Sequence, residues 1–241
     1  MLENLVRKNI QALKPYSCAR DEFKGRDAHV FLDANESAYN APYNRYPDPL
    51  QESLKKDIST IKGVPSGKIF LGNGSDEAID LVYRIFCEPR VDNVVAIEPT
   101  YGMYKVCADI NDVEYRTVCL SDNYAMSADA LLQACDEHTK VVWICSPNNP
   151  TGCIYTKDTL DAIHGVLVDK PIFVLCDDVY RELVYTEDYH SFSEYTDMRD
   201  RIIVIQAFSK PYAMTGWRLG YCLADAPIRD RIQIFHQHMV V

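Results

Sequence analysis

The sequence contains no apolar run long enough to cross a bilayer and no excess of basic charge. Its longest apolar runs, such as residues 141–145, fall far short of the roughly 20 residues that a spanning helix needs. The 25 basic and 35 acidic side chains give a net charge of −10, whereas nucleic-acid-binding proteins concentrate positive charge. Residues 1–8 mix charged with apolar side chains and lack the apolar core of a signal peptide. We therefore expect no membrane span, no secretion and no nucleic-acid partner.

Cysteine pairs with Cys-x-x-Cys spacing are also missing, although the chain has nine cysteines. Their absence argues against the commonest zinc and redox frameworks, so we expect no metal site. Several cysteines lie within apolar runs, where a free thiol behaves as a small buried hydrophobic group, which indicates a cytoplasmic, reducing environment. The chain also lacks a Gly-x-Gly-x-x-Gly or P-loop string, which argues against a plain nucleotide-binding module.

After residue 48, short apolar runs alternate regularly with segments of helical spacing. The runs are residues 69–71, 93–97, 115–120, 140–145, 171–176 and 201–205. The helical segments are residues 50–61, 79–86, 101–110, 128–135, 157–168 and 227–238. This alternation predicts an α/β fold with a mostly parallel sheet and helices on both faces. Ligands bind such sheets beyond the carboxyl ends of the strands, so the chemistry is expected directly after each run.

The first forty-odd residues form an irregular arm. An apolar stripe at helical spacing ends at Pro15 and comprises Leu2, Leu5, Val6, Ile10 and Leu13. A turn-rich stretch with several prolines follows. Because this arm has no clear core of its own, we expect it to pack on something else, such as a partner subunit.

A glycine-rich turn follows the run at residues 69–71 and leads into a helical segment. Gly74, a capping Ser75 and the acidic Asp76 are typical of a helix N-terminus, where free N–H groups can hold a phosphate. An ordinary capped helix has the same appearance.

Polar side chains follow the next two buried runs. Residues 146–152 form a proline-rigid turn that is expected to fix the amide of Asn149 at the sheet edge. Asp177 follows the run at 171–176, where a carboxylate is costly unless it pairs with a cation such as a protonated pyridine nitrogen. Tyr180, three residues later, can reach a ring hydroxyl. An ordinary turn and an aspartate helix cap are the plainer alternatives.

Two cationic side chains follow the last run. A lysine such as Lys210, lined by apolar neighbours, can act as a nucleophile toward an aldehyde. Arg218 offers a bidentate clamp for a phosphate dianion. An amine, two phosphate-binding devices, a carboxylate for a pyridinium and polar groups for a phenolate together meet the requirements of pyridoxal 5′-phosphate.

The order of these residues resembles the aspartate-aminotransferase superfamily of fold type I. The resemblance implies that Lys210 forms the Schiff base with the cofactor and that Asp177 pairs with the pyridine nitrogen. Asn149 and Tyr180 would then contact the ring oxygen. The phosphate contacts that the resemblance implies are Gly74, Ser75, Asp76, Ser209 and Arg218.

Three strings in the arm look like the histidinol-phosphate aminotransferase family: residues 13–16, 32–36 and 44–49. Residues 99–104 agree, and Tyr101 matches the aromatic that stacks on the cofactor ring. The resemblance covers essentially the whole chain and implies a homodimer in which Tyr46 reaches the partner's site. It implies amino transfer between histidinol phosphate, as amino donor, and the 2-oxo acid 2-oxoglutarate, in histidine biosynthesis. The substrate contacts that it implies are Tyr16, Arg20, Asn35 and Tyr46.

Two departures from the family leave alternatives open. Residues 210–218 look more like general aspartate or aromatic aminotransferases, and threonine-phosphate decarboxylase shares the scaffold and a phosphorylated substrate. Family members continue past Val241 into a small C-terminal domain that supplies the arginine for the substrate carboxylate. We therefore expect an arm at 1–47 and a cofactor-binding large domain at 48–241, with the small domain absent. A non-catalytic cofactor-binding fragment is the alternative from another class.

Overall fold

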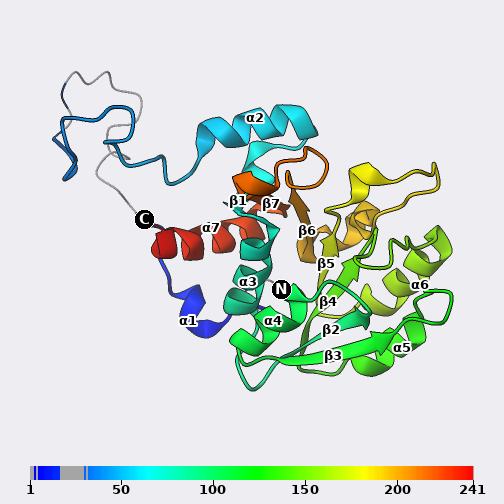
Figure 1. The fold of residues 1–241 in the computed structure, drawn as a ribbon. Coiled ribbons are helices and arrows are strands. Elements are labelled where there is room, and N and C mark those ends of the chain that lie inside the picture. The colour runs from blue at the N-terminus through cyan, green and yellow to red at the C-terminus, as the bar shows by residue number, and fades with distance from the viewer. Residues whose placement is uncertain (1–2, 4, 17–29, 31, 241) are drawn as a thin grey trace.

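A seven-stranded sheet runs through the centre of the structure, a computed structural model that describes residues 3, 5–16, 30 and 32–240. The strands lie in the order β1-β7-β6-β5-β4-β2-β3 (Figure 1). Strands β2 to β6 are parallel, and β7 is antiparallel to both of its neighbours. The strands are β1 (Ile69–Asn73), β2 (Asn93–Glu98), β3 (Glu114–Cys119), β4 (Thr139–Cys145), β5 (Phe173–Asp177), β6 (Ile202–Ala207) and β7 (Leu219–Leu223).

Successive side chains of the strands build a core on each face of the sheet. Along β4, Val141 and Trp143 contribute to one core, whereas Val142 and Ile144 contribute to the other. The first face is covered by α1 (Lys8–Gln11), α3 (Ser75–Phe86), α4 (Met103–Ile110) and α7 (Ala226–Val240). The second face is covered by α5 (Ala128–Ala134) and α6 (Lys157–Leu167), and α2 (Glu52–Lys62) packs near β1 and β7 (Figure 1).

The predicted α/β fold with a mostly parallel sheet and helices on both faces is confirmed. All six predicted runs form strands whose ends lie within two residues of the expected positions. Strand β7 was missed because Gly220 interrupts its short apolar stretch and because it follows directly on the segment that holds Arg218. None of the described helices is both long enough and apolar enough to span a membrane.

The arm differs from the prediction in its first part. The expected helix is only the four residues of α1, and Leu5, Val6 and Ile10 are buried in the core that α3 and α7 share. The N–H of Arg7 donates to the carbonyl of Ile85 in α3 at 3.0 Å. This first part of the arm therefore packs on the body of its own chain, and a partner subunit is not needed to cover it. Residues 32–49 instead project from the body beyond the end of α7 (Figure 1).

Candidate functional site

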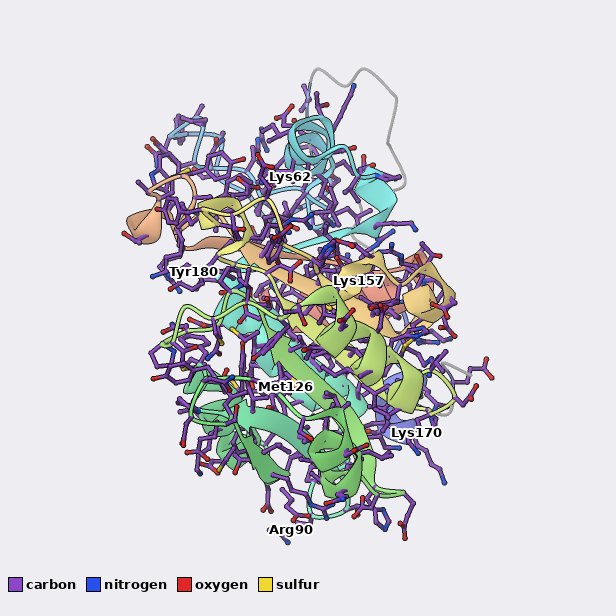
Figure 2. The ribbon with its side chains drawn as sticks, turned by 90° about the vertical axis from the view of Figure 1, so that its right-hand side faces the viewer. Lys62, Arg90, Met126, Lys157, Lys170 and Tyr180 are labelled. Atoms are coloured by element: carbon purple, nitrogen blue, oxygen red, sulfur yellow. The ribbon has the colours of Figure 1, made fainter. Side chains whose placement is uncertain are left out.

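A cavity opens where the parallel strands end and where α3 begins. Tyr180 and Lys170, which lie beyond the two ends of β5, are at opposite ends of the sheet (Figure 2), so the cavity lies at the carboxyl end. Six predicted site residues meet there although they come from distant parts of the chain. The cavity is lined by Ser75, Tyr101, Cys145, Asn149, Asp177, Val179, Tyr180 and Lys210.

Asp177 is the buried acid of the cavity. It is the last residue of β5 and only 4% exposed. The hydroxyl of Tyr104 donates to its Oδ2 at 2.5 Å, and the N–H of Val179 donates to Oδ1 at 3.3 Å. Burial raises the pKa of Asp177 to about 6, against the opposing effect of these hydrogen bonds. No ion pair to Asp177 occurs among the described residues, so a cation in the cavity would meet an unpaired carboxylate.

The neighbouring Asp178 does not line the cavity. Its Oδ2 accepts a hydrogen bond from the hydroxyl of Ser191 at 2.7 Å and lies 3.7 Å from Nη1 of Arg181. Burial raises the pKa of Asp178 to about 7. Of the two adjacent carboxylates, Asp177 is therefore the one available to a ligand.

These two acids predict how the stability of the cofactor-free protein depends on pH. Both have a pKa above 3.8, the usual value for aspartate, so the folded protein binds more protons than the unfolded chain between about pH 4 and 7. The stability that their protonated forms contribute is complete below pH 4 and is lost as each acid ionises. A double variant with Asp177→Asn and Asp178→Asn should therefore gain free energy of unfolding relative to the parent as pH rises through this range. Urea unfolding of both proteins at several pH values measures the difference, and a constant difference would contradict the assignment.

The turn before α3 leaves the first N–H groups of that helix without a capping side chain. Helix α3 begins at Ser75, and Gly74 occupies the N-cap position with φ 80° and no side-chain cap. The prediction that Ser75 caps the helix is wrong, because the helix starts one residue earlier than a serine cap requires. The carboxylate of Glu77 instead accepts a hydrogen bond from the N–H of Asn73 at 2.5 Å. An uncapped helix N-terminus is suited to an anion.

Arg218 lies directly against this turn. Its backbone is left-handed, with φ 51°, and its Nη2 lies 3.4 Å from Oδ2 of Asp76. A Cβ atom on Gly74 would approach Nη2 of Arg218 to 2.5 Å, and one on Gly220 would approach the backbone nitrogen of Ser75 to 2.2 Å. Gly220 is thus required for β7 to come close to the start of α3, since the atoms that a Cβ would meet there belong to the backbone. At Gly74 the guanidinium could shift, and it is the φ of 80° that favours glycine.

Two tyrosines and a lysine stand around the cavity. The hydroxyl of Tyr101 donates to Oδ1 of Asp76 at 2.9 Å, and burial raises the pKa of Tyr101. Nζ of Lys210 lies 5.9 Å from the ring centroid of Tyr180. Lys210 is exposed, whereas Ser209 is buried and outside the cavity lining. An exposed lysine and the buried Asp177 therefore line the same cavity.

The asparagine turn is held by Asn148, which sequence analysis did not single out. Its amide donates to the carbonyl of Pro99 and to Oγ1 of Thr151, both at 2.9 Å, and it accepts from Thr100 at 2.8 Å. This leaves the half-buried Asn149 on the cavity wall, next to Tyr180, and both residues also line an adjoining groove between residues 147–154 and 180–186.

The predicted substrate residues lie away from this cavity. Tyr16, Asn35 and Tyr46 are exposed in the arm and do not line it, and Arg20 lies outside the described residues. The carboxylate of Glu36 accepts from the N–H of Tyr46 at 2.8 Å. Its other oxygen lies 2.7 Å from Nη1 of Arg45, so the two bonds hold the turn while the ring of Tyr46 stays 62% exposed.

Three buried residues of the site were missed: Cys145 and Val179 in the lining, and Tyr104 behind Asp177. A thiol at the last position of a strand and an apolar residue two positions after an aspartate carry no distinctive signal. Tyr104 occupies a core position of a helical stripe, so its hydroxyl was not expected to reach a strand end.

A family model for aminotransferases of class I and II matches residues 20–241. The chain belongs to this family. A histidinol-phosphate aminotransferase of Bacteroides fragilis strain YCH46 is 54% identical over 228 residues, which are 94% of this chain and 64% of that protein. A protein of the same name from Flavobacterium johnsoniae is 39% identical, again over 64% of its length. The chain thus spans less than two thirds of the length of these relatives.

Solved structures of aminotransferases have the same fold. Aspartate aminotransferase from Thermotoga maritima superimposes with a TM-score of 0.73 at 25% identity, covering 97% of this chain and 70% of that one. N-Succinyldiaminopimelate aminotransferase from Mycobacterium tuberculosis superimposes with a TM-score of 0.72 at 28% identity. The match covers 82% of this chain and 54% of that one.

Membership of this family implies pyridoxal phosphate as the cofactor, and the cavity suits that group. Asp177 is a buried carboxylate without a cationic partner among the described residues, as a pyridinium ring requires. The uncapped start of α3 and the guanidinium of Arg218 form a cradle for a phosphate. Lys210 supplies an accessible amine on the same cavity.

Proposed function

We propose that the protein is a pyridoxal-phosphate-dependent aminotransferase that moves an amino group between histidinol phosphate and 2-oxoglutarate. The observation that carries the proposal is the meeting of Lys210, Asp177 and Tyr180 with Asn149 and Tyr101 around one cavity. The 54% identity to a protein named histidinol-phosphate aminotransferase supports this substrate pair.

Each residue around the cavity has a separate role in binding the cofactor. Asp177 would pair with the pyridine nitrogen, Asn149 and Tyr180 would orient the ring oxygen, and Tyr101 would pack on the ring. The start of α3 would hold the phosphate, with the binding residues Gly74, Ser75, Asp76, Ser209 and Arg218. Asp76 reaches the phosphate region through its backbone N–H, because its carboxylate is already bonded to Tyr101 and Arg218.

Pyridoxal phosphate, when bound, supplies an aldehyde for the amino group and a ring that takes up electrons from the substrate α-carbon. Lys210 would hold the cofactor in the resting protein and would become free when the substrate amine takes its place. Its free amine would then take the proton from the substrate α-carbon as a general base and give it, as a general acid, to the cofactor carbon. Asp177 would keep a proton on the pyridine nitrogen.

The arm at residues 1–47 packs, in this proposal, against a second copy of the chain, and residues 48–241 form the cofactor-binding large domain. Leu32, Tyr39 and Tyr43 in the arm are each more than 80% exposed, and burial in a homodimer accounts for such side chains. We expect the protein to act in the reducing cytosol, since the eight cysteines in the described part of the chain are all free thiols.

A broad aspartate or aromatic aminotransferase is the second candidate, favoured by the segment around Trp217. That side chain is 75% exposed beside Arg218, where an aromatic substrate or a partner segment can cover it. Threonine-phosphate decarboxylase is a third candidate, because the phosphate cradle suits any phosphorylated amine.

An amino-donor screen tests the function. The purified protein, in the longest form that its gene encodes, is loaded with pyridoxal phosphate and mixed with histidinol phosphate, aspartate, phenylalanine or threonine phosphate. Conversion of the donor bleaches the visible absorbance of the bound cofactor, and histidinol phosphate is expected to do so at the lowest concentration. A preference for aspartate or phenylalanine would favour the second candidate. Cofactor binding without conversion of any donor would favour a non-catalytic protein.

Tyr46→Phe is expected to weaken the binding of phosphorylated substrates and to leave the binding of other substrates unchanged. In a homodimer the exposed phenol of Tyr46 donates to the substrate phosphate in the partner's site. One hydrogen bond to a charged group is worth roughly 1.5–3 kcal/mol, so KM for histidinol phosphate should rise about ten- to a hundredfold. KM for 2-oxoglutarate should change little. Steady-state kinetics with both substrates measures the effect.

Tyr43→Phe is the matched control, because Tyr43 is 83% exposed in the same arm. It should leave both KM values unchanged. Equal losses for phosphorylated and non-phosphorylated substrates in Tyr46→Phe would contradict a phosphate contact and indicate a role in folding or cofactor binding.

A further inference from the structure

Behind Asp177, on the side away from solvent, lies a group of buried aromatic side chains that the proposed chemistry does not use. Tyr104 is fully buried in α4, and its hydroxyl donates to Oδ2 of Asp177 at 2.5 Å. The other oxygen, Oδ1, has only the long 3.3 Å contact with the N–H of Val179. Tyr104 therefore makes the one strong hydrogen bond that Asp177 receives from a described side chain.

Tyr104 is itself held from two sides. Its ring stacks on the indole of Trp143 in β4, with centroids 4.2 Å apart and planes inclined by 13°. The hydroxyl of Tyr83 in α3 donates to the backbone carbonyl of Tyr104 at 2.8 Å and accepts from Nε1 of Trp143 at 3.0 Å. Two neighbouring elements, β4 at the ring and α3 at the backbone, thus fix Tyr104, so its hydroxyl has a set position before any ligand arrives.

The other groups near Asp177 do not replace this bond. The titratable and charged groups that face Asp177 or share its cavity are Asp76, Tyr101, Cys145, Asp178, Tyr180 and Lys210. The charge of Asp76 opposes ionisation of Asp177, and the thiol of Cys145 is kept neutral because burial raises its pKa. A donor to the charged form of Asp177 is therefore needed to keep a carboxylate in this place.

We infer that Tyr104 is a positioning residue for the cofactor: its hydroxyl fixes one oxygen of the Asp177 carboxylate and leaves the other oxygen for the pyridinium. This inference rests on the proposed function, because it assigns the cation in the cavity to the ring of pyridoxal phosphate. Of the three aromatic side chains, only Tyr104 contacts Asp177, so it alone acts on the cofactor, and only through that carboxylate.

The test compares Tyr104→Phe with Tyr83→Phe. Each variant removes one buried hydroxyl and keeps the ring, but only Tyr104→Phe removes a donor to Asp177. At pH 7 the dissociation constant of pyridoxal phosphate, from absorbance titration of the cofactor-free protein, should rise about tenfold or more in Tyr104→Phe. In Tyr83→Phe it should stay within about threefold of the parent value. Equal dissociation constants in the parent and Tyr104→Phe would overturn the inference.

Unfolding of the cofactor-free variants gives a readout that needs no cofactor. The stability lost in Tyr104→Phe should grow as pH rises from about 5 to 8, because the missing donor matters only when Asp177 is ionised. The loss in Tyr83→Phe should not depend on pH, and the same pH dependence in both variants would overturn the inference. Failure of the parent to bind pyridoxal phosphate would instead contradict the proposed function, while the unfolding data would still test whether Tyr104 acts on Asp177.

Discussion

Lys210→Ala is expected to reduce turnover by at least about 10²–10⁴-fold, the range that a positioned general acid–base group contributes. Lys210 stands three residues beyond the end of β6, and its amine faces the same cavity as Asp177. The other described lysines do not line this cavity, so none can take over proton transfer at the substrate α-carbon. Rates of amino transfer from histidinol phosphate, measured in the longest natural form of the protein, give the size of the effect.

Lys157→Ala provides the control for this variant. Lys157 lies on α6, where it pairs with Asp161 on the helix surface, away from the cavity lining (Figure 2). Removing it should leave turnover unchanged. Residual turnover of Lys210→Ala near the parent rate would show that the proton is moved by another group, and the assignment of Lys210 would be wrong.

Asp177→Asn is expected to retain some cofactor but to lose at least about hundredfold in turnover. In the loaded protein Asp177 is proposed to form a buried ion pair with the pyridinium of the cofactor, and removing one member of such a pair costs roughly 3–5 kcal/mol. An amide also cannot hold a proton on the pyridine nitrogen. The same variant should stabilise the cofactor-free protein at pH 8. The pKa shift from 3.8 to about 6 sets an upper limit of about 3 kcal/mol on this gain.

Asp178→Asn separates the two adjacent acids. Asp178 bonds to Ser191 and lies outside the cavity lining, so its variant should keep most of its turnover. Near-normal turnover in Asp177→Asn together with a large loss in Asp178→Asn would reverse the assignment. Kinetics of the two variants under identical conditions, with urea unfolding at pH 8, decides between these outcomes.

The sequence predicts the sheet and most of the cavity because strand ends are easy to locate. In a parallel sheet the carboxyl ends of buried strands share one edge, so Asn149, Asp177 and Lys210 were expected at the same edge once the runs before them were recognised as strands. Spacing alone, however, does not give the strand order, nor the antiparallel β7 that brings Arg218 to the start of α3.

The sequence was less informative where a side chain acts from within the core. Tyr104 lies at a buried position of α4 and looks like any other core aromatic, and its contact with Asp177 depends on how α4 packs on β4 and β5. The prediction that Ser75 caps α3 was wrong for a related reason. The helix begins at Ser75 itself, so this serine is the first helical residue and Gly74 is the N-cap. Such differences are set by tertiary packing.

The most direct test of the account is to locate the bound cofactor. The protein is loaded with pyridoxal phosphate, reduced with borohydride and digested, and the modified peptide is identified by mass spectrometry. The account predicts a yellow protein with the reduced cofactor attached to Lys210 and to no other lysine. Attachment to a different lysine, or no attachment at all, would contradict it.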